Sequence, residues 1–116
     1  MNEYQKLINQ YDEKEMTLTP EEMAEYAAKI KNVKEGAELA GIEELVSERV
    51  ALVESVLADA GRETIADYLS TGFLSLDDFE NELKQRTPRG WLIFHLRIDL
   101  ADFYNQIYEA YEEQNE

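Results

Sequence analysis

Hydrophobic residues recur at spacings of three and four along most of the chain, which is the pattern of amphipathic α-helices. Residues 4–11 carry a short stripe of this kind and predict a first helix. A longer stripe begins near residue 23, and the strongest begins at about Ile42. The members of the third stripe are Leu45, Val46, Val50, Val53, Val56 and Leu57. The pattern therefore predicts a chain that is helical nearly throughout.

Local signals place most helix boundaries. The run Thr19–Glu22 reads as a capping box with proline at the first helical position. Gly36 and Gly41 predict a loosened stretch of chain between them. Gly61 predicts the end of a helix or a bend in it, and Gly72 predicts the end of the next helix. Ser75 is the expected cap of a further helix, and the last helix is expected to begin between Pro88 and Gly90.

The last predicted helix is apolar on unusually many sides. Its main stripe is Leu92, Leu96, Leu100, Phe103 and Ile107, and further large side chains widen it. Such a helix lies centrally in a core or forms a dimer interface. Residues 91–98 also have the composition of a strand but lack a partner strand. We predict an all-α fold, a single compact domain over residues 1–116 with about five to six helices and a long C-terminal helix.

Charge narrows the range of partners. The chain has 26 acidic and 11 basic residues, so its net charge is −15. A polyanion repels nucleic-acid backbones and anionic lipid, which favours a partner with a basic surface.

The absence of cysteine excludes disulfides and thiolate zinc sites and fits a reducing cytoplasm. Residues 1–11 do not resemble a signal peptide, and no apolar run approaches the length of a membrane span.

Residues that carry catalytic or metal chemistry are scarce. The single histidine, His95, lies in the most apolar segment and is expected to be a core or interface residue. Asp77, Asp78, Glu80 and Glu82 are the best local candidates for calcium, but their spacing is not that of an EF-hand loop. We therefore expect no enzyme activity, no metal site and no cofactor.

The negative charge is concentrated in the middle of the chain. Residues 35–83 hold 13 acids against Arg49 and Arg62, a net charge of −11. Several acids lie four apart, where like charges on a helix destabilise it. These rows are Asp59–Glu63–Asp67, Glu44–Glu48, Asp78–Glu82 and Glu109–Glu113. Two interpretations are open: a solvated face that keeps the protein soluble, or a surface that imitates the phosphates of DNA.

Three stretches carry a resemblance to a known class of proteins. They are residues 66–70 with the acidic run 76–80, residues 97–100, and the tyrosine- and glutamate-bearing end 107–113. They resemble the DNA-mimic antirestriction proteins of phages and plasmids, most closely the phage Ocr family. Residues 76–83 and 98–103 resemble the ArdA family more loosely. The resemblance implies an all-helical acidic dimer in the bacterial host cytoplasm that occupies the DNA cleft of a type I restriction–modification enzyme.

The DNA-mimic hypothesis assigns one set of residues, and the large apolar surface of the last predicted helix assigns a second. The carboxylates expected to stand in for phosphates are Asp59, Glu63, Asp67, Asp77, Asp78, Glu80, Glu82, Asp99, Asp102, Glu109, Glu112 and Glu113. The expected homodimer interface is Trp91, Phe94, Ile98, Tyr104 and Tyr108.

Two alternatives stay open. One is a specific inhibitor or immunity protein for a basic nuclease, toxin or CRISPR effector, acting through aromatic anchors. Those anchors would be Tyr68, Phe73, Tyr104, Tyr108 or Tyr111. The other is a helical interaction module without inhibitory function.

Overall fold

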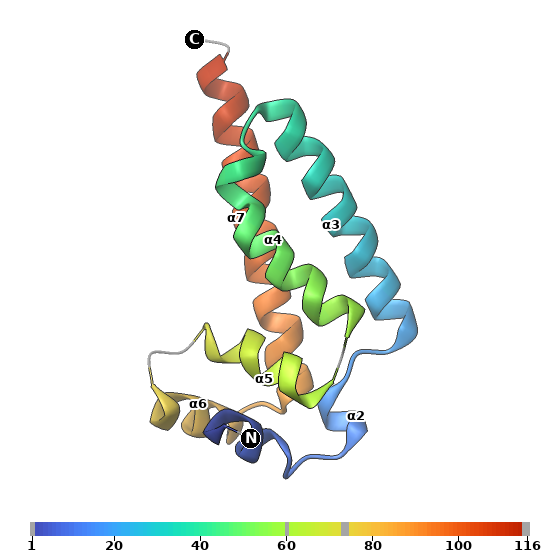
Figure 1. The fold of residues 1–116 in the computed structure, drawn as a ribbon, viewed down its shortest axis with the longest axis vertical. Helices are drawn as coiled ribbons and strands as arrows, with labels where there is room; N and C mark the ends of the chain where they lie inside the picture. Colours follow the sequence, from blue (N-terminus) through green and yellow to red (C-terminus); the bar gives the residue numbers. More distant parts are fainter. Residues whose placement is uncertain (1, 60, 73–74, 115–116) are drawn as a thin grey trace.

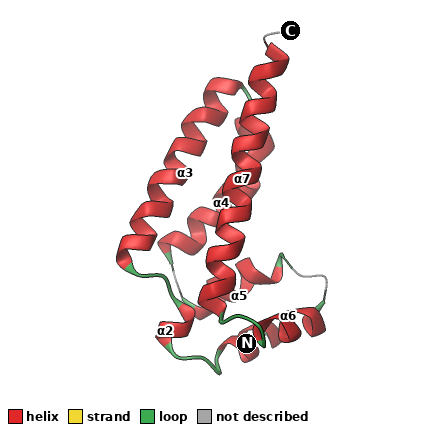
Figure 2. Ribbon diagram, turned by 180° about the vertical axis from the view of Figure 1, so that it is seen from behind, coloured by secondary structure: helices red, strands yellow, loops and turns green. Residues whose placement is uncertain are grey.

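Helices make up all the regular structure that the described residues contain. The computed structural model describes residues 2–59, 61–72 and 75–114. The elements are α1 (Glu3–Ile8), α2 (Glu13–Met16), α3 (Pro20–Ala40), α4 (Glu43–Ala58), α5 (Arg62–Ser70), α6 (Leu76–Leu83) and α7 (Pro88–Gln114). The predicted all-α class is confirmed, and residues 91–98 belong to a helix rather than a strand (Figure 2). Six helices have six or more residues, and the single turn α2 is additional.

The helices form a long three-helix part and a shorter base. In Figure 1, α3 rises along the long axis, α4 returns beside it, and α7 rises again next to both. Helices α1, α2, α5 and α6 gather around the beginning of α7 (Figures 1 and 2). The molecule measures 51 × 30 × 23 Å. One helix, α7, therefore connects the base to the far end of the bundle.

Two predicted helix starts are confirmed by cap hydrogen bonds. The Thr19 hydroxyl accepts from the backbone N–H of Glu22 at 3.1 Å, and the Glu22 carboxylate accepts from the N–H of Thr19 at 3.0 Å. This is the predicted capping box. The Ser75 hydroxyl accepts from the N–H of Asp78 at 3.1 Å and begins α6, and α7 begins at Pro88.

The stretch between the first two glycines differs from the prediction. Helix α3 runs through Gly36 without a break and ends only at Gly41, whose φ of 75° is the left-handed conformation that glycine favours. A Cβ on Gly36 would lie 3.2 Å from the Cδ1 atom of Ile107. Gly36 therefore allows α3 and α7 to approach each other closely and does not loosen the helix.

The unpredicted turn α2 begins where the Asp12 carboxylate caps the N–H of Glu15 at 3.1 Å.

One hydrophobic core receives side chains from every described helix. The most buried contributions, one for each helix in chain order, are Ile8, Met16, Val33, Val53, Ile65, Phe79 and Leu96. Each of these side chains is nearly inaccessible to water. The shared core fixes the helices relative to one another and so holds their outer, charged faces in place. None of the helices in the described residues combines the length and apolar character needed to cross a membrane.

Candidate functional site

The carboxylates expected to act as phosphate analogues are nearly all exposed. Of the twelve, ten are exposed, Glu82 is half-buried and Asp99 is buried. Five ion pairs form within the described residues, and Asp99 is the only member of the twelve that takes part in one. The other eleven therefore carry charge that no neighbouring base of the described chain neutralises.

The structure places these carboxylates in separate groups. Asp77, Asp78 and Glu80 lie on α6 in the base, whereas Glu109 and Glu113 lie near the far end of α7 (Figure 1). The groups are thus spread along the 51 Å axis and do not form one compact patch. Among the described residues, no three His, Asp or Glu side chains come together in a way that could hold a metal ion.

The predicted row Asp59–Glu63–Asp67 is interrupted. Asp59 follows the end of α4 and α5 begins only at Arg62, so Asp59 is not on the same helix as the other two. Its carboxylate accepts from the N–H of Gly61 at 3.0 Å and from the hydroxyl of Thr64 at 3.2 Å. Asp59 therefore organises the α4–α5 connection, and the predicted spacing of four holds only for Glu63 and Asp67.

Asp99 is the clearest correction to the predicted set, because it is buried on the inner side of α7. Its two carboxylate oxygens accept from Nε and Nη2 of Arg49, each at 2.9 Å, which is a bidentate pair. The Tyr68 hydroxyl donates a third hydrogen bond to the same carboxylate. The third guanidinium nitrogen of Arg49, Nη1, donates to the Thr71 hydroxyl at 2.9 Å. Asp99 is an internal anchor and cannot face a partner.

The ionisation of this cluster follows from its surroundings. Burial raises the pKa of Tyr68, and the charge and hydrogen bond of Asp99 raise it further, so the phenol stays protonated as a donor. Burial alone would lower the pKa of Arg49, but the hydrogen bonds and charge of Asp99 outweigh it and the net shift is upward. The arrangement is an ion pair between Arg49 and Asp99 with the neutral Tyr68 hydroxyl as a further donor, and it connects helices of the core.

His95 lies one helical turn before Asp99 and packs against its neighbours. Its ring lies 5.8 Å from that of Trp91, measured between centroids, and the backbone of Gly72 approaches it so closely that a Cβ there would collide with the imidazole. Burial lowers the pKa of His95, partly offset by the charge of Asp99. The imidazole is therefore a half-buried packing residue, in keeping with the predicted core or interface histidine.

The outer face of α7 carries large apolar side chains. Phe94 is 36 % exposed, Ile98 41 %, Tyr104 44 % and Tyr108 63 %. These four members of the predicted dimer interface are thus accessible. Trp91 is not: it is buried in its own chain, its ring N–H donates to the Glu82 carbonyl at 2.7 Å, and its inclusion in that interface was wrong.

The proposed aromatic anchors also separate into two kinds. Tyr104, Tyr108 and Tyr111 are exposed on α7. Tyr68 is buried with its hydroxyl on Asp99, so it cannot act as an anchor for a partner. Phe73 lies outside the described residues.

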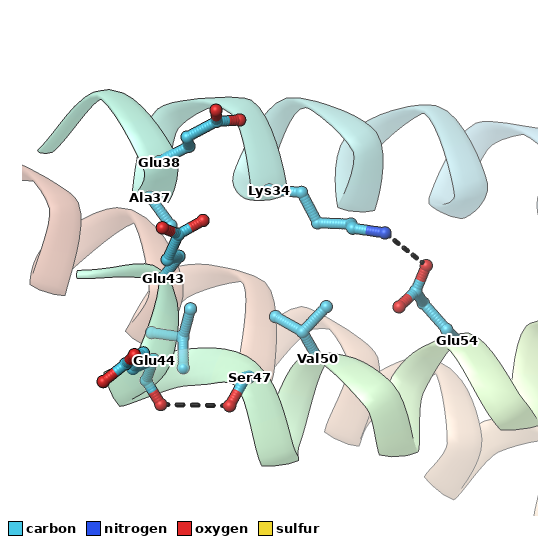
Figure 3. Close-up of a pocket in the computed structure, with 9 residues that line it drawn as sticks. Lys34, Ala37, Glu38, Glu43, Glu44, Ser47, Val50 and Glu54 are labelled. Atoms are coloured by element: carbon cyan, nitrogen blue, oxygen red, sulfur yellow. Dashed lines mark hydrogen bonds and ion pairs between the residues drawn. The ribbon is translucent and has the colours of Figure 1, made fainter. Parts of the chain in front are cut away.

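Sequence reasoning missed a groove between α3 and α4. Buried Ala37, Val46 and Val50 contribute to its floor, and Glu38, Glu43, Glu44 and Glu54 line it as well (Figure 3). None of these acids is in the predicted set. The signal that could have found them is the small size of the apolar residues on the facing stripes of the two helices, which leaves a furrow rather than a ridge.

Comparisons of the chain with protein-family models, with curated proteins and with solved structures found no match.

Proposed function

We propose that the protein is an acidic inhibitor that mimics DNA and occupies the DNA-binding cleft of a bacterial restriction–modification enzyme or another defence enzyme. The observation that carries the proposal is a set of exposed carboxylates that form no ion pair within the described residues and are spread, most of them on helices, along a 51 Å molecule. The proposed activity is binding and requires neither catalysis nor a cofactor.

The magnitude of the charge is compatible with this role. Duplex DNA carries about one negative charge per 1.7 Å of axis, so a 51 Å duplex carries about 30. The chain has a net charge of −15, about half of that. A cleft contacts only part of the circumference of a duplex and so only part of its charge, and two chains lying side by side would supply a net charge of −30.

Binding would use the contacts that normally hold phosphates. Arginine grips carboxylate and phosphate alike with paired hydrogen bonds, so Arg and Lys in the target cleft would accept Asp and Glu in place of DNA. The concentrated charge would also accelerate association, and this rate would fall steeply with added salt. Inhibition should therefore be competitive with duplex DNA and weaker at high ionic strength.

The test measures DNA cleavage by a type I restriction enzyme at increasing inhibitor concentration. One variant replaces Asp77 and Asp78 by Asn, and a second adds Glu80→Gln, Glu109→Gln, Glu112→Gln and Glu113→Gln. We expect a several-fold loss of inhibition at the first step and a further graded loss at the second. The matched control for the first step is Glu3→Gln with Glu25→Gln, because these two acids are already paired with Lys6 and Lys29 at 3.0 Å. Unchanged inhibition after all six neutralisations contradicts the mimicry.

A second candidate is a specific inhibitor that acts through aromatic anchors, and the exposed Tyr104, Tyr108 and Tyr111 on α7 favour it. In that case Tyr108→Ala would abolish binding, whereas neutralising acids would mainly slow association. Surface plasmon resonance of the two kinds of variant separates the candidates, because mimicry predicts the reverse order of effects.

The same face of α7 is also the proposed homodimer interface. Phe94, Ile98, Tyr104 and Tyr108 would pack against a second copy and so lose their exposure to water. Light scattering at micromolar concentration should give twice the chain mass, and Ile98→Glu should return it to that of one chain. A single-chain mass for the unmodified protein contradicts the dimer.

A further inference from the structure

A groove runs along the seam between α3 and α4. At one end a volume of about 330 Å³ is lined by residues of both helices, from Lys34 and Glu38 on α3 to Glu43 and Glu54 on α4. An adjoining volume of about 340 Å³ shares Lys34, Glu38 and Glu54 with the first. A third of about 260 Å³ shares Glu54 with both and extends to Ala58 near the end of α4. The three volumes follow one another along the same pair of helices.

The floor of the groove is made of apolar side chains, most of them Ala or Val. Ala27, Ile30 and Ala37 come from α3, and Val46, Val50, Leu57 and Ala58 come from α4. Between residues 27 and 38 the groove follows α3 for about 17 Å, at 1.5 Å per residue. A furrow of this length between two antiparallel helices accepts a third helix, whose side chains can pack into it.

The rim of the groove is acidic. Glu35, Glu38, Glu43, Glu44 and Glu54 line it together with Lys31 and Lys34. The lining thus has three more negative than positive charges. Lys34 reaches across from α3, and its Nζ lies 3.1 Å from a carboxylate oxygen of Glu54 on α4 (Figure 3). The site already holds one ammonium group over its apolar floor.

We infer that this groove binds a basic amphipathic helix of a partner protein. Small apolar side chains of the partner would lie on the Ala and Val floor, and its Lys or Arg side chains would pair with the glutamates of the rim. The ammonium of Lys34 shows the place that such a cation would take, and a bound helix would displace it from Glu54. This surface differs from the carboxylates proposed to meet a DNA cleft and does not depend on that proposal.

The experiment uses the full chain and a synthetic probe. The probe is a fluorescent helix-forming peptide of about 16 residues with Lys on one face and Ala and Leu on the other, long enough to cover the groove. Its scrambled isomer has the same charge and no apolar face. Fluorescence anisotropy should show saturable binding of the amphipathic peptide that weakens with salt, and much weaker binding of the scrambled one.

Charge variants locate the binding. Glu38→Gln with Glu43→Gln should weaken binding about three- to tenfold, as expected for the loss of two partly exposed ion pairs. The matched control, Glu13→Gln with Glu21→Gln, removes the same charge from exposed residues that do not line the groove and should change binding less than twofold. Lys34→Gln should tighten binding several-fold because it releases Glu54. Its control Lys29→Gln breaks the 3.0 Å pair with Glu25 outside the groove and should have little effect.

A steric pair completes the design. Ser47 lines the groove and is exposed, whereas Ser55 is exposed on the same helix and does not line it. Ser47→Phe should block the peptide, and Ser55→Phe should not, while circular dichroism checks that both variants remain folded.

Three results would overturn the inference. They are equal binding of the scrambled peptide, equal binding to the two Phe variants, or no binding of the amphipathic probe at all. Inhibition of a restriction enzyme by the Ser47→Phe variant is measured in parallel, so that the groove and the DNA mimicry can fail independently.

Discussion

Two aspartates on α7, three residues apart, have opposite environments. Asp99 is buried and receives hydrogen bonds from Arg49 and Tyr68, whereas Asp102 is exposed and takes part in no ion pair within the described residues. In the sequence each of them counts as one negative charge. The structure separates an internal carboxylate that ties α4, α5 and α7 together from an exposed one whose side chain makes no such contact among the described residues. The net charge of −15 therefore combines structural and surface charge.

The difference has a physical origin. Water screens an exposed carboxylate, so neighbouring charges alter its energy little. Inside the protein the same group must be matched by donors, and removing one partner leaves the others uncompensated. Substitutions in the cluster should therefore affect folding, while those on the surface should affect binding.

The largest effect is expected from Asp99→Ala. It leaves the guanidinium of Arg49 and the buried hydroxyl of Tyr68 without their acceptor. Breaking a buried pair costs about 3–5 kcal/mol, and because Arg49 is one-third exposed we expect about 2–3 kcal/mol. Urea denaturation measures the loss. Asp102→Ala on the same helix is the control and should change the free energy of unfolding by less than about 0.5 kcal/mol. Equal effects of the two substitutions would remove the distinction drawn above.

Gly72→Ala should have the next largest effect. The new methyl group would collide with the imidazole of His95, which packs beside the Asp99 cluster. Overpacking of this kind costs about 1–3 kcal/mol. A double-mutant cycle with His95→Ala measures the coupling, since removal of the ring should recover most of the loss. A Gly72→Ala variant as stable as the unmodified protein contradicts the close approach.

Acid pH should act through His95 by a smaller amount. Burial lowers the pKa of His95 below its ordinary 6.5, so the unfolded chain binds more protons between the two pKa values. The contribution of the neutral imidazole to stability is complete above about pH 6.5, the pKa of the unfolded chain. It is lost as the pH falls from there to the lower pKa of His95 in the folded protein. Asp99 and Arg49 modify this shift in opposite directions. Urea midpoints of the unmodified protein and of His95→Gln should diverge between about pH 7.5 and 5.5, and parallel curves would contradict the shift.

The smallest effect is expected at the end of α7, and it has the opposite sign. Glu109 and Glu113 lie four apart and close to the negative end of the helix dipole. Glu109→Gln with Glu113→Gln should raise the free energy of unfolding by a few tenths of a kcal/mol, and added salt should remove the gain. Glu3→Gln is the control, because Glu3 is in the first turn of α1 and pairs with Lys6 at 3.0 Å, so its neutralisation should not stabilise.

Helix boundaries could be predicted because their signals are local. The capping box at Thr19 and the cap at Ser75 depend on residues three positions away, and the structure forms both. Gly36 was misjudged because its role depends on Ile107, far along the chain. The all-α class followed from the periodicity alone.

The burial of Asp99 could not be deduced from its residue type, because its partners come from other helices. Arg49 and Tyr68 lie 50 and 31 residues before it. A weaker signal was present, since Asp99 lies between Leu96 and Phe103 at helical spacing and so belongs to the buried side of α7. The lone arginine of α4 was the other indication.

Helix α7 packs against α2, α3, α4 and α5, yet it follows all of them in the chain. During synthesis the faces that α7 covers therefore stay exposed to water while its 27 residues are added. At about 5–20 residues per second this takes roughly one to five seconds. During that interval the α3–α4 hairpin of the nascent chain exposes to water the apolar side that α7 later covers, and a chaperone has time to bind it.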